Sequence, residues 1–468
     1  MAQKQHINGR KNKQNLKKIL GKDNMPEKKR ESDNAIADDA ENNKKEAMPV
    51  IKPVEGMVRD KAPVQNGFSS NEKKAMDEKE KNLIIAEMSD RWHTMEEVKD
   101  LCDVINLALQ VLYGKDAKQL PVGWIKHMAH KSPYRSFMIP KKKKGKFRKI
   151  DAPCKELRNV QRALNLVFQL IYTPHESAMG FVPKRSVVTN ARVHLGQKFV
   201  YNIDLKDFFP SITSGRLYKR LLVKPFCINE KVASIISDLC CYKDDYGKKV
   251  LPQGAPTSPT ITNFICERLD MKLTKLAKSY GLKYTRYADD ITFSGMSNVF
   301  SPNGKFCTSL SNIIENEESF KINKDKTRLC HCGMRQEVTG LTVNNKTNVS
   351  RKYIKQLRVL IHNWEVKGYD RAQAIFAEHY KETNTRHLLS KGEHHIENII
   401  SGKLMYLKMV KGNGDDTYKA LSMRFDKLIE AQFGGKLPSP MIVKEDGKVE
   451  LLQELTNLVN LIETNTPE

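Results

Sequence analysis

The acidic pair Asp289 and Asp290 is the first feature of this sequence that could do chemistry. It follows Tyr287 and Ala288 within residues 283–295, where β-branched and aromatic residues on both sides predict two strands joined by a tight turn. Two adjacent carboxylates repel each other, and burying either of them is costly. A divalent cation would remove that conflict, and Mg²⁺ takes one or two protein carboxylates while leaving its other positions to phosphate and water. An exposed Asp-Asp turn without a metal is the alternative.

A second acidic position favours the metal. Asp204 ends an apolar stretch that begins at Val200, before Pro210 stops regular strand pairing. If the two strands lie side by side in one sheet, Asp204 and Asp289 would bracket two metal ions about 4 Å apart, as in-line phosphoryl transfer requires. One ion would lower the pKa of an attacking hydroxyl, and the other would neutralise charge on a leaving pyrophosphate.

A Pro-Gln-Gly loop, residues 252–254, lies between the two acidic sites and precedes an apolar helical stretch, residues 261–276. Its glycine permits close backbone approach, and the Ser and Thr residues after it suit a helix cap. In the order Asp204, Pro-Gln-Gly, Tyr-Ala-Asp-Asp, the sequence resembles the reverse transcriptases, from about residue 134 to about residue 428.

The resemblance implies an α+β right-hand polymerase with fingers, a ferredoxin-like palm and a helical thumb, preceded by a disordered N-terminal extension. It also implies RNA-directed DNA polymerase activity with dNTPs and two Mg²⁺ ions, which Mn²⁺ could replace. The implied metal-binding residues are Asp204, Leu205, Asp289 and Asp290.

Several further residues match positions that act on the nucleotide in the resembled enzymes. Lys326 matches a lysine that can protonate the leaving pyrophosphate, although Lys324 is an equally basic neighbour. Phe209 matches an aromatic gate that leaves no room for a 2′-hydroxyl and so favours dNTPs; simple core packing is the alternative. Gln253 and Gly254 match the loop that contacts the incoming nucleotide or the template.

A dense run of basic residues marks a second hairpin. Residues 137–153 look like two strands around a Lys/Gly turn, which would carry positive charge at its tip. In the resembled enzymes this hairpin closes over the incoming triphosphate, and Lys144, Lys146 and Arg148 are the matching residues. A guanidinium holds two phosphate oxygens at once, whereas a lysine acts as a point charge. A solvated basic turn is the alternative.

Two short patterns narrow the resemblance to the retron reverse transcriptases of bacteria. The first is NAxxH, with Asn190 and His194; the second is Val338-Thr339-Gly340. Asn190 and His194 are four positions apart on an expected helix, so they share a face that could bind RNA or brace the palm. Thr339 and Gly340 offer a small surface with a hydroxyl for a backbone or 2′-hydroxyl contact, or they form a β-turn at the palm edge.

The retron resemblance implies a cognate structured non-coding RNA that serves as template and primer. DNA synthesis would begin at an internal guanosine 2′-hydroxyl and give branched RNA–DNA (msDNA). It further implies a role in antiphage defence with an accessory effector protein. Because the sequence lacks a spaced acidic set for RNase H, we expect a host RNase H to remove the template.

Composition agrees with a nucleic-acid partner. The chain carries a net charge of +25, from 80 basic and 55 acidic residues, and the first 100 residues are nearly neutral, so the excess lies in the expected folded part. No apolar run approaches the roughly 20 residues that span a bilayer, so no membrane partner is expected. Nine cysteines without a paired CxxC framework favour a cytoplasmic protein.

The composition and periodicity of the sequence predict a disordered charged extension (1–82), N-terminal helices (83–133) and a tail with one helix (434–468). Between them, the resemblance to the reverse transcriptases implies fingers (134–198), the catalytic palm (199–349) and a helical thumb (350–433).

Other functions remain open from the sequence alone. The nearest is another bacterial reverse transcriptase, either a non-retron defence enzyme or a group II intron type. An RNA-dependent RNA polymerase usually has a Gly before its Asp pair, and Phe209 argues against it. A non-catalytic RNA-binding protein on a polymerase fold is the alternative from another class, against which the three aspartates argue.

Overall fold

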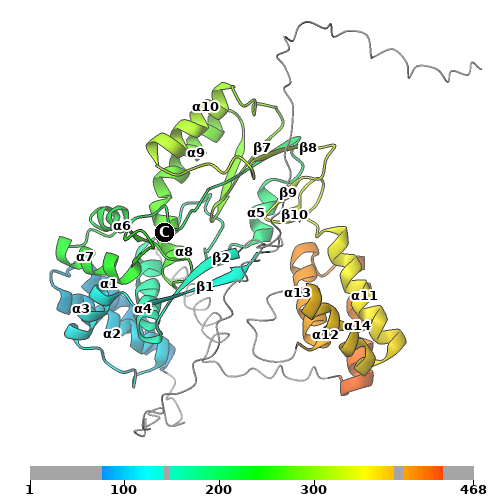
Figure 1. The fold of residues 1–468 in the computed structure, drawn as a ribbon, viewed down its shortest axis with the longest axis horizontal. Helices are drawn as coiled ribbons and strands as arrows, with labels where there is room; N and C mark the ends of the chain where they lie inside the picture. Colours follow the sequence, from blue (N-terminus) through cyan, green and yellow to red (C-terminus); the bar gives the residue numbers. More distant parts are fainter. Residues whose placement is uncertain (1–75, 142–146, 384–393, 436–468) are drawn as a thin grey trace, which may run out of the picture. The chain divides into compact units, whose positions relative to one another are not determined.

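The computed structural model describes residues 76–141, 147–383 and 394–435 (Figure 1). Three helices open it: α1 (Glu78–His93), α2 (Val98–Tyr113) and α3 (Val122–Lys131). Helix α1 begins earlier than the residue 83 expected from apolar spacing, because the Asp77 side chain caps it by accepting from the Glu80 N–H at 2.8 Å. The rest of the expected extension lies outside the described residues.

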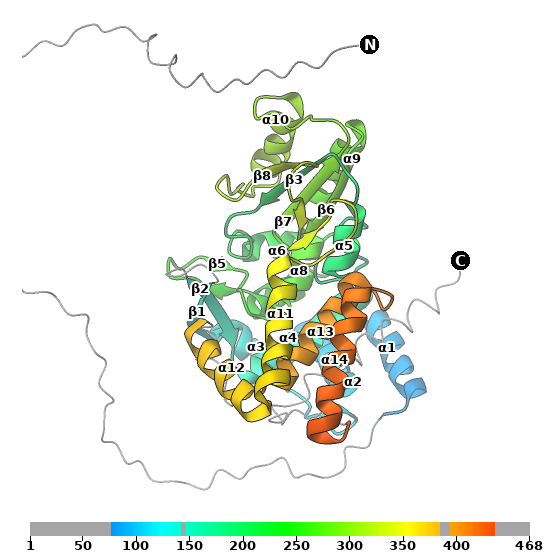
Figure 2. The same ribbon diagram turned by 90° about the vertical axis from the view of Figure 1, so that its right-hand side faces the viewer.

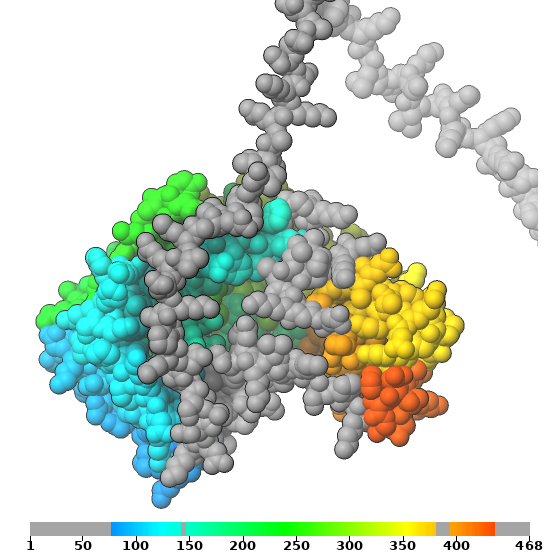
Figure 3. All heavy atoms as spheres, turned by 60° about the horizontal axis from the view of Figure 1, so that its bottom comes forward, coloured from blue at the N-terminus to red at the C-terminus, as the bar shows by residue number. Residues whose placement is uncertain are grey.

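The expected basic hairpin is present. Strands β1 (Tyr134–Pro140) and β2 (Phe147–Pro153) pair antiparallel and lead into helix α4 (Lys155–Ile171). The hairpin tip, with Lys144 and Lys146, lies outside the described residues. Helix α4 packs against α1 and α2, and these elements form a continuous surface, coloured blue to cyan in Figure 3.

The palm is a four-stranded antiparallel sheet in the order β6-β7-β3-β8. Its strands are β3 (Phe199–Asp204), β6 (Lys283–Tyr287), β7 (Asp290–Gly295) and β8 (Arg328–His331). Helices α8 (Ser258–Ile265) and α9 (Glu267–Ser279) connect β3 to β6 along the chain, while α10 (Lys305–Ser311) and the π-helical turn η1 (Asn312–Glu317) connect β7 to β8. This order and connectivity confirm the predicted ferredoxin-like palm.

Additional elements lie between β3 and α8. They are helices α6 (Ser214–Leu221) and α7 (Glu230–Cys240) and the short strands β4 (Tyr242–Lys243) and β5 (Lys249–Val250). The side chains of these helices join α1–α4, α8, α9 and the palm in one large hydrophobic core. Four aromatic rings, Trp92, Phe168, Phe226 and Phe264, meet edge to face within it.

A second core holds the thumb. Helices α11 (Arg351–Lys367), α12 (Tyr369–Thr383), α13 (Ile396–Lys411) and α14 (Asp416–Phe433) pack on one another (Figure 2). The same core includes α5 (Val187–Val193) and the two-stranded pair β9 (Glu337–Val338) and β10 (Leu341–Thr342). The thumb is therefore continuous with the two segments that carry the retron-like patterns. The helix expected in the tail lies outside the described residues.

None of the helices within the described residues combines the length and apolar character that crossing a membrane would need.

Candidate active site

The palm sheet has one apolar and one polar face, and the acidic residues lie on the polar one. Side chains alternate along each strand, so Ile291 and Phe293 face the core on the α9 and α10 side, where Phe293 meets Phe306 with ring centroids 5.2 Å apart. Asp204 and Asp290 are direct partners in the β3–β7 register. Because cross-strand partners point to the same face, these two carboxylates come together at one end of the sheet.

Asp289 stands in the two-residue turn that joins β6 to β7. Ala288 in this turn has a φ of 57°. Gly180 packs against it so closely that a Cβ at residue 180 would come within 2.7 Å of the Ala288 nitrogen. The Leu205 N–H donates to the Asp289 carbonyl at 3.0 Å. The turn is thus held from two sides, and Asp289 stands beside the end of β3.

A buried ion pair supports the same turn from the apolar side. The Arg286 guanidinium donates to both carboxylate oxygens of Asp270, at 2.8 and 2.6 Å, and to the Ala288 carbonyl at 3.2 Å. The Tyr284 hydroxyl also donates to Asp270, at 2.7 Å. Sequence reasoning missed this network. The sequence feature that could have revealed it is one charged residue on the apolar side of α9, Asp270, and one on the apolar side of β6, Arg286. Both side chains are fully buried.

Asp204 is held by the loop that precedes β8. Asn323 donates to one Asp204 oxygen at 3.0 Å, and the Lys326 ammonium donates to the other at 2.7 Å. The Asn323 N–H also bonds the Asp204 carbonyl at 2.8 Å. Of the two lysines weighed from the sequence, it is Lys326 that reaches the acidic group in this structure. Asn323 was not singled out, although it lies in the same short motif.

Desolvation and neighbouring carboxylates raise the pKa of Asp289 and Asp290. Desolvation, followed by the neighbouring Asp289 and Asp204, raises the pKa of Asp290 to about 6. Desolvation is also the largest cause that raises the pKa of Asp289, while Lys326 and Arg148 act in the opposite direction. Asp290 is exposed at its outer edge yet has protein atoms on most other sides, so solvent screening reduces the energetic size of this effect.

The donor set fits Mg²⁺. Within residues 76–141, 147–383 and 394–435, no three His, Cys, Asp or Glu side chains lie where they would enclose a metal by themselves. Mg²⁺ does not need such a cage, because it binds through one or two carboxylates and completes its shell with phosphate and water. Asp204, Asp289 and Asp290 supply hard oxygen donors whose mutual repulsion a divalent cation would relieve. Leu205, which was assigned to the metal set, is buried beside them.

Phe209 lies next to the acidic face and is half-buried. Its ring meets the buried Phe208 edge to face, with centroids 5.6 Å apart, and Phe208 in turn packs on Phe320. The ring is therefore supported from below while part of it remains exposed. This arrangement suits a surface against which a sugar could rest, and it also leaves Phe209 attached to the core.

The Pro-Gln-Gly loop is joined to the basic hairpin. The Asp151 N–H donates to the Gln253 carbonyl at 3.0 Å. Gly254 has a φ of 139°, and a Cβ there would come within 2.8 Å of Ile150 and 3.1 Å of the Asp151 carbonyl oxygen. Only glycine fits this approach. Arg148, on the same strand, is exposed and close enough to Asp289 to lower its pKa.

The NAxxH residues lie inside the molecule. His194 is fully buried, and its Nδ1 and Nε2 lie 2.7 Å from the Ser294 and Thr285 hydroxyls on β7 and β6. Burial lowers the pKa of His194 to about 3, so the ring is neutral. Of the two roles weighed for this face, the burial of both ring nitrogens and their contacts with β6 and β7 favour bracing of the β6–β7 hairpin by His194 over direct RNA contact.

Asn190 joins this helix to the Val338-Thr339-Gly340 turn. Its amide donates to the Thr339 hydroxyl at 3.4 Å, while its buried Oδ1 has no hydrogen-bond partner among the described residues. Asn190 and Val338 are buried, so contacts to RNA at their side chains would require movement. Thr339 is half-buried and Gly340 is exposed, at φ of 47° and 81°. A β-branched residue is strained at such a φ, which marks Thr339 as a functional candidate.

Comparisons with known proteins agree with this geometry. The family described as "Reverse transcriptase (RNA-dependent DNA polymerase)" matches residues 139–367. The retron Mx162 reverse transcriptase of Myxococcus xanthus is 38% identical over 259 residues, which cover 49% of this chain and 52% of that protein. The retron Mx65 reverse transcriptase of the same organism is 36% identical and covers 52% and 60%. The retron Ec86 reverse transcriptase of Escherichia coli is 33% identical over 268 residues, which cover 55% of this chain and 80% of that protein.

The chain thus matches little more than half the length of the two Myxococcus proteins and most of the Escherichia coli protein. Among solved structures, telomerase from Candida albicans with the TWJ fragment of telomeric RNA aligns with 72% of this chain and 66% of that chain. Its TM-score is 0.34 at 11% identity.

Proposed function

Because this chain belongs to the retron reverse transcriptases, we propose that it is an RNA-directed DNA polymerase that copies a cognate structured RNA. The observation that carries the proposal is the pairing of Asp204 with Asp290, beside Asp289, on the polar face of the palm. A structural carboxylate cluster would have its charge neutralised by the protein, whereas the pKa values of Asp289 and Asp290 are raised, mainly by desolvation.

We assign Mg²⁺ to Asp204, Asp289 and Asp290, with Leu205 beside them. When bound, the metal would activate the attacking hydroxyl and neutralise charge on the leaving pyrophosphate. Lys326 stands at Asp204 and can hold a proton for the leaving group. Arg148 faces the same carboxylates from β2 and can hold the triphosphate, for which Lys144 and Lys146 are further candidates.

The remaining nucleotide contacts would set position and sugar choice. Gln253 and Gly254, joined to β2 by the Asp151 N–H, would contact the nascent base pair. The exposed part of the Phe209 ring would occupy the space that a 2′-hydroxyl needs, so dNTPs would be used.

The retron-specific part of the proposal concerns priming. A cognate RNA would present an internal guanosine 2′-hydroxyl, and its extension would give branched RNA–DNA. Thr339 and Gly340 would contact this RNA at the surface, while Asn190 and His194 would hold that turn and the catalytic hairpin in fixed positions. An accessory effector, a host RNase H and a role in antiphage defence follow from the family alone.

The test uses two substrates and a change of one hydroxyl. Thr339→Val keeps the β-branched shape, and with it the backbone strain, but removes the hydroxyl. We expect extension of a generic primed RNA template to be unchanged. Priming from RNA that co-purifies with the wild-type protein should fall by orders of magnitude, because the reacting atoms must be held within about 3–3.5 Å.

Thr308→Val, on α10, is the matched control and should affect neither substrate. Equal loss on both substrates for Thr339→Val would mean that the turn only braces the palm. Sequencing the co-purified RNA and DNA must also reveal a branched product. If no branched product is found, the proposal of priming from a 2′-hydroxyl is wrong. Extension of the generic primed template tests the polymerase activity independently of that result.

A further inference from the structure

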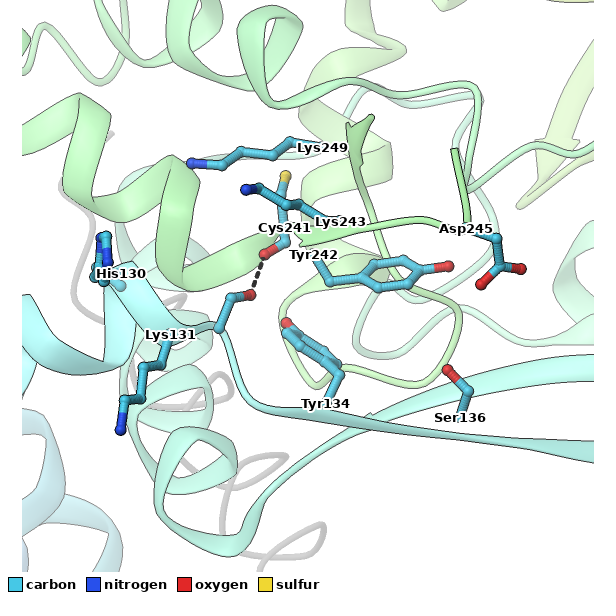
Figure 4. Close-up of a pocket in the computed structure, with 11 residues that line it drawn as sticks. His130, Lys131, Tyr134, Ser136, Cys241, Tyr242, Lys243, Asp245 and Lys249 are labelled. Carbon is cyan, nitrogen blue, oxygen red and sulfur yellow. Dashed lines mark hydrogen bonds between the residues drawn. The ribbon is translucent and has the colours of Figure 1, made fainter. Parts of the chain in front are cut away.

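A small pocket lies at the base of the basic hairpin, on the side away from Arg148. Its volume is about 260 Å³, and it is lined by α3, β1 and the β4–β5 pair (Figure 4). Ser136 and Asp151 are register partners, so they share one face of the hairpin, while Arg148 alternates to the other. The pocket is therefore separate from the proposed nucleotide site.

The walls of the pocket are preformed by internal contacts. Ser132 ends α3 and donates through its hydroxyl to the Cys241 carbonyl at 2.8 Å. The Tyr134 and Tyr242 rings pack on each other with centroids 5.5 Å apart, and the Tyr134 hydroxyl accepts from Gln161 at 2.6 Å. Binding here would not require these groups to become ordered first, which lowers its cost.

The lining carries uncompensated positive charge. Two of its ionic groups are already paired: Lys249 with Asp238, and Asp245 with Lys149. The remaining charged groups are Lys131 and Lys243, whose side chains make no ion pair or hydrogen bond among the described residues, and His130 lines the same pocket. Figure 4 shows Lys243 and Lys249 extending toward the end of the pocket at which His130 lies, whereas the Lys131 side chain extends from α3 in another direction, so that only its stem lines the pocket.

Compensation of a helix dipole explains only part of this charge. His130 and Lys131 are in the last turn of α3, where cations are favourable without any ligand. Lys243 is on β4, three residues after the end of α7, and therefore lies outside the last turn of a helix, where the dipole effect is concentrated. The pocket is also slightly smaller than the roughly 300–1,000 Å³ of usual small-molecule sites, so it suits one group of a larger anion.

We propose that this pocket binds a backbone phosphate of structured RNA outside the catalytic cleft. The proposal rests on the proposed function, since it presumes an RNA substrate. Lysine ammonium groups recognise phosphate as point charges without reading sequence, so the contact would add affinity and orientation but not base specificity.

The test is Lys131→Gln with Lys243→Gln, assayed by fluorescence anisotropy with a labelled hairpin RNA of arbitrary sequence. We expect several-fold weaker binding and a log–log salt dependence shallower by about 1 to 2, because each phosphate contact contributes about 1 to that slope. Extension at saturating primed template should be unchanged. The charge-conserving pair Lys131→Arg and Lys243→Arg should bind RNA like the wild type.

Lys275→Gln with Lys278→Gln is the matched control, because both lysines are exposed on α9 and outside the pocket. Equal slopes of log affinity against log salt for the pocket and control variants would overturn the proposal. It would also be overturned if ATP raised the unfolding temperature of the wild type but not of the pocket variant, because the pocket would then be a free-nucleotide site. If the wild type binds no RNA, the proposed function fails as well; if it binds RNA and the pocket variant binds equally, only the pocket assignment fails.

Discussion

Two groups of carboxylates lie on opposite faces of the same hairpin and differ in how their charge is compensated. On the apolar face, Asp270 is fully buried and accepts hydrogen bonds from Arg286 and Tyr284. On the polar face, desolvation and the neighbouring carboxylate of Asp204 raise the pKa of both Asp289 and Asp290, and Asp289 also raises that of Asp290, which reaches about 6.

The difference separates a structural role from a functional one. Asp270 has its partner within the fold, so its charge stabilises the native state only as part of that pair. Asp204 is paired with Lys326, but Asp289 and Asp290 have no such partner among the described residues, so their charge is a cost that a bound cation would remove. Arg286 of this ion pair also donates to the Ala288 carbonyl. The buried pair therefore holds in place the turn that carries Asp289 and leads into Asp290.

The largest effect is expected from Asp289→Asn combined with Asp290→Asn. Mg²⁺-dependent dNTP incorporation should fall by several orders of magnitude, because neutral amides bind a divalent cation poorly. Folding and RNA binding should be retained, since these side chains form no ion pair with any residue that the structure describes. Primer extension, together with thermal unfolding and RNA anisotropy, measures all three quantities. Wild-type extension by the double variant would contradict the active-site assignment.

Breaking the compensated site should act mainly on stability. Asp270→Asn leaves the buried Arg286 guanidinium without its counter-charge, and loss of one partner of a buried pair costs about 3–5 kcal/mol. Urea unfolding measures this cost. Combining Asp270→Asn with Arg286→Met should recover part of the loss, because no buried charge then remains. If Asp270→Asn leaves the free energy of unfolding unchanged while the variant with Asp289→Asn and Asp290→Asn is unfolded, the structural role belongs to the polar-face carboxylates and not to Asp270.

Sequence pattern was sufficient for the palm. The β-branched and aromatic residues of 283–295 and the apolar stretch that ends at Asp204 predicted the strands and the turn, and β3 and β7 lie side by side in the sheet. These signals are local in the sequence.

Long-range partners could not be predicted in the same way. The contact of Asp270 with Arg286 depends on how α9 packs against β6. His194 illustrates the same limit: spacing placed it correctly on a shared face with Asn190, but spacing does not reveal that Thr285 and Ser294 lie against that face. Burial is a property of the assembled fold.

A smaller effect is expected at the aromatic ring beside the polar face. Phe209→Ala should admit rNTPs by removing the ring that excludes the 2′-hydroxyl, and competition between dNTP and rNTP in primer extension measures this change. Because Phe209 is only half-buried, the stability loss should be below the 3–5 kcal/mol typical of a buried Phe→Ala change.

Phe293→Ala, on the apolar face, is the contrasting variant. Phe293 is fully buried, so its truncation should cost the full amount in urea unfolding without changing sugar selectivity in the folded fraction. If Phe209→Ala shows no increase in rNTP incorporation, the ring is part of the core and not a gate.

The smallest expected effect is a pH dependence of stability that distinguishes the polar face. Asp290 has a folded-state pKa of about 6, above the value of about 3.9 for an unfolded aspartate. Between these two values the folded state binds more protons, so this residue makes the protein less stable as the pH rises.

Asp290→Asn removes the penalty and should therefore unfold at a higher temperature than the wild type at neutral pH in EDTA, with the advantage disappearing near pH 4. The gain should be no more than about 1 kcal/mol, because solvent screens the exposed side of Asp290. His194, whose pKa is lowered to about 3, contributes the opposite slope, but it is present in both proteins and cancels in the difference. If the difference in unfolding temperature between Asp290→Asn and the wild type stayed constant from pH 4 to neutral pH, the Asp290 carboxylate would carry no electrostatic cost. The two faces would then differ in the positions of their carboxylates but not in how the charge is compensated.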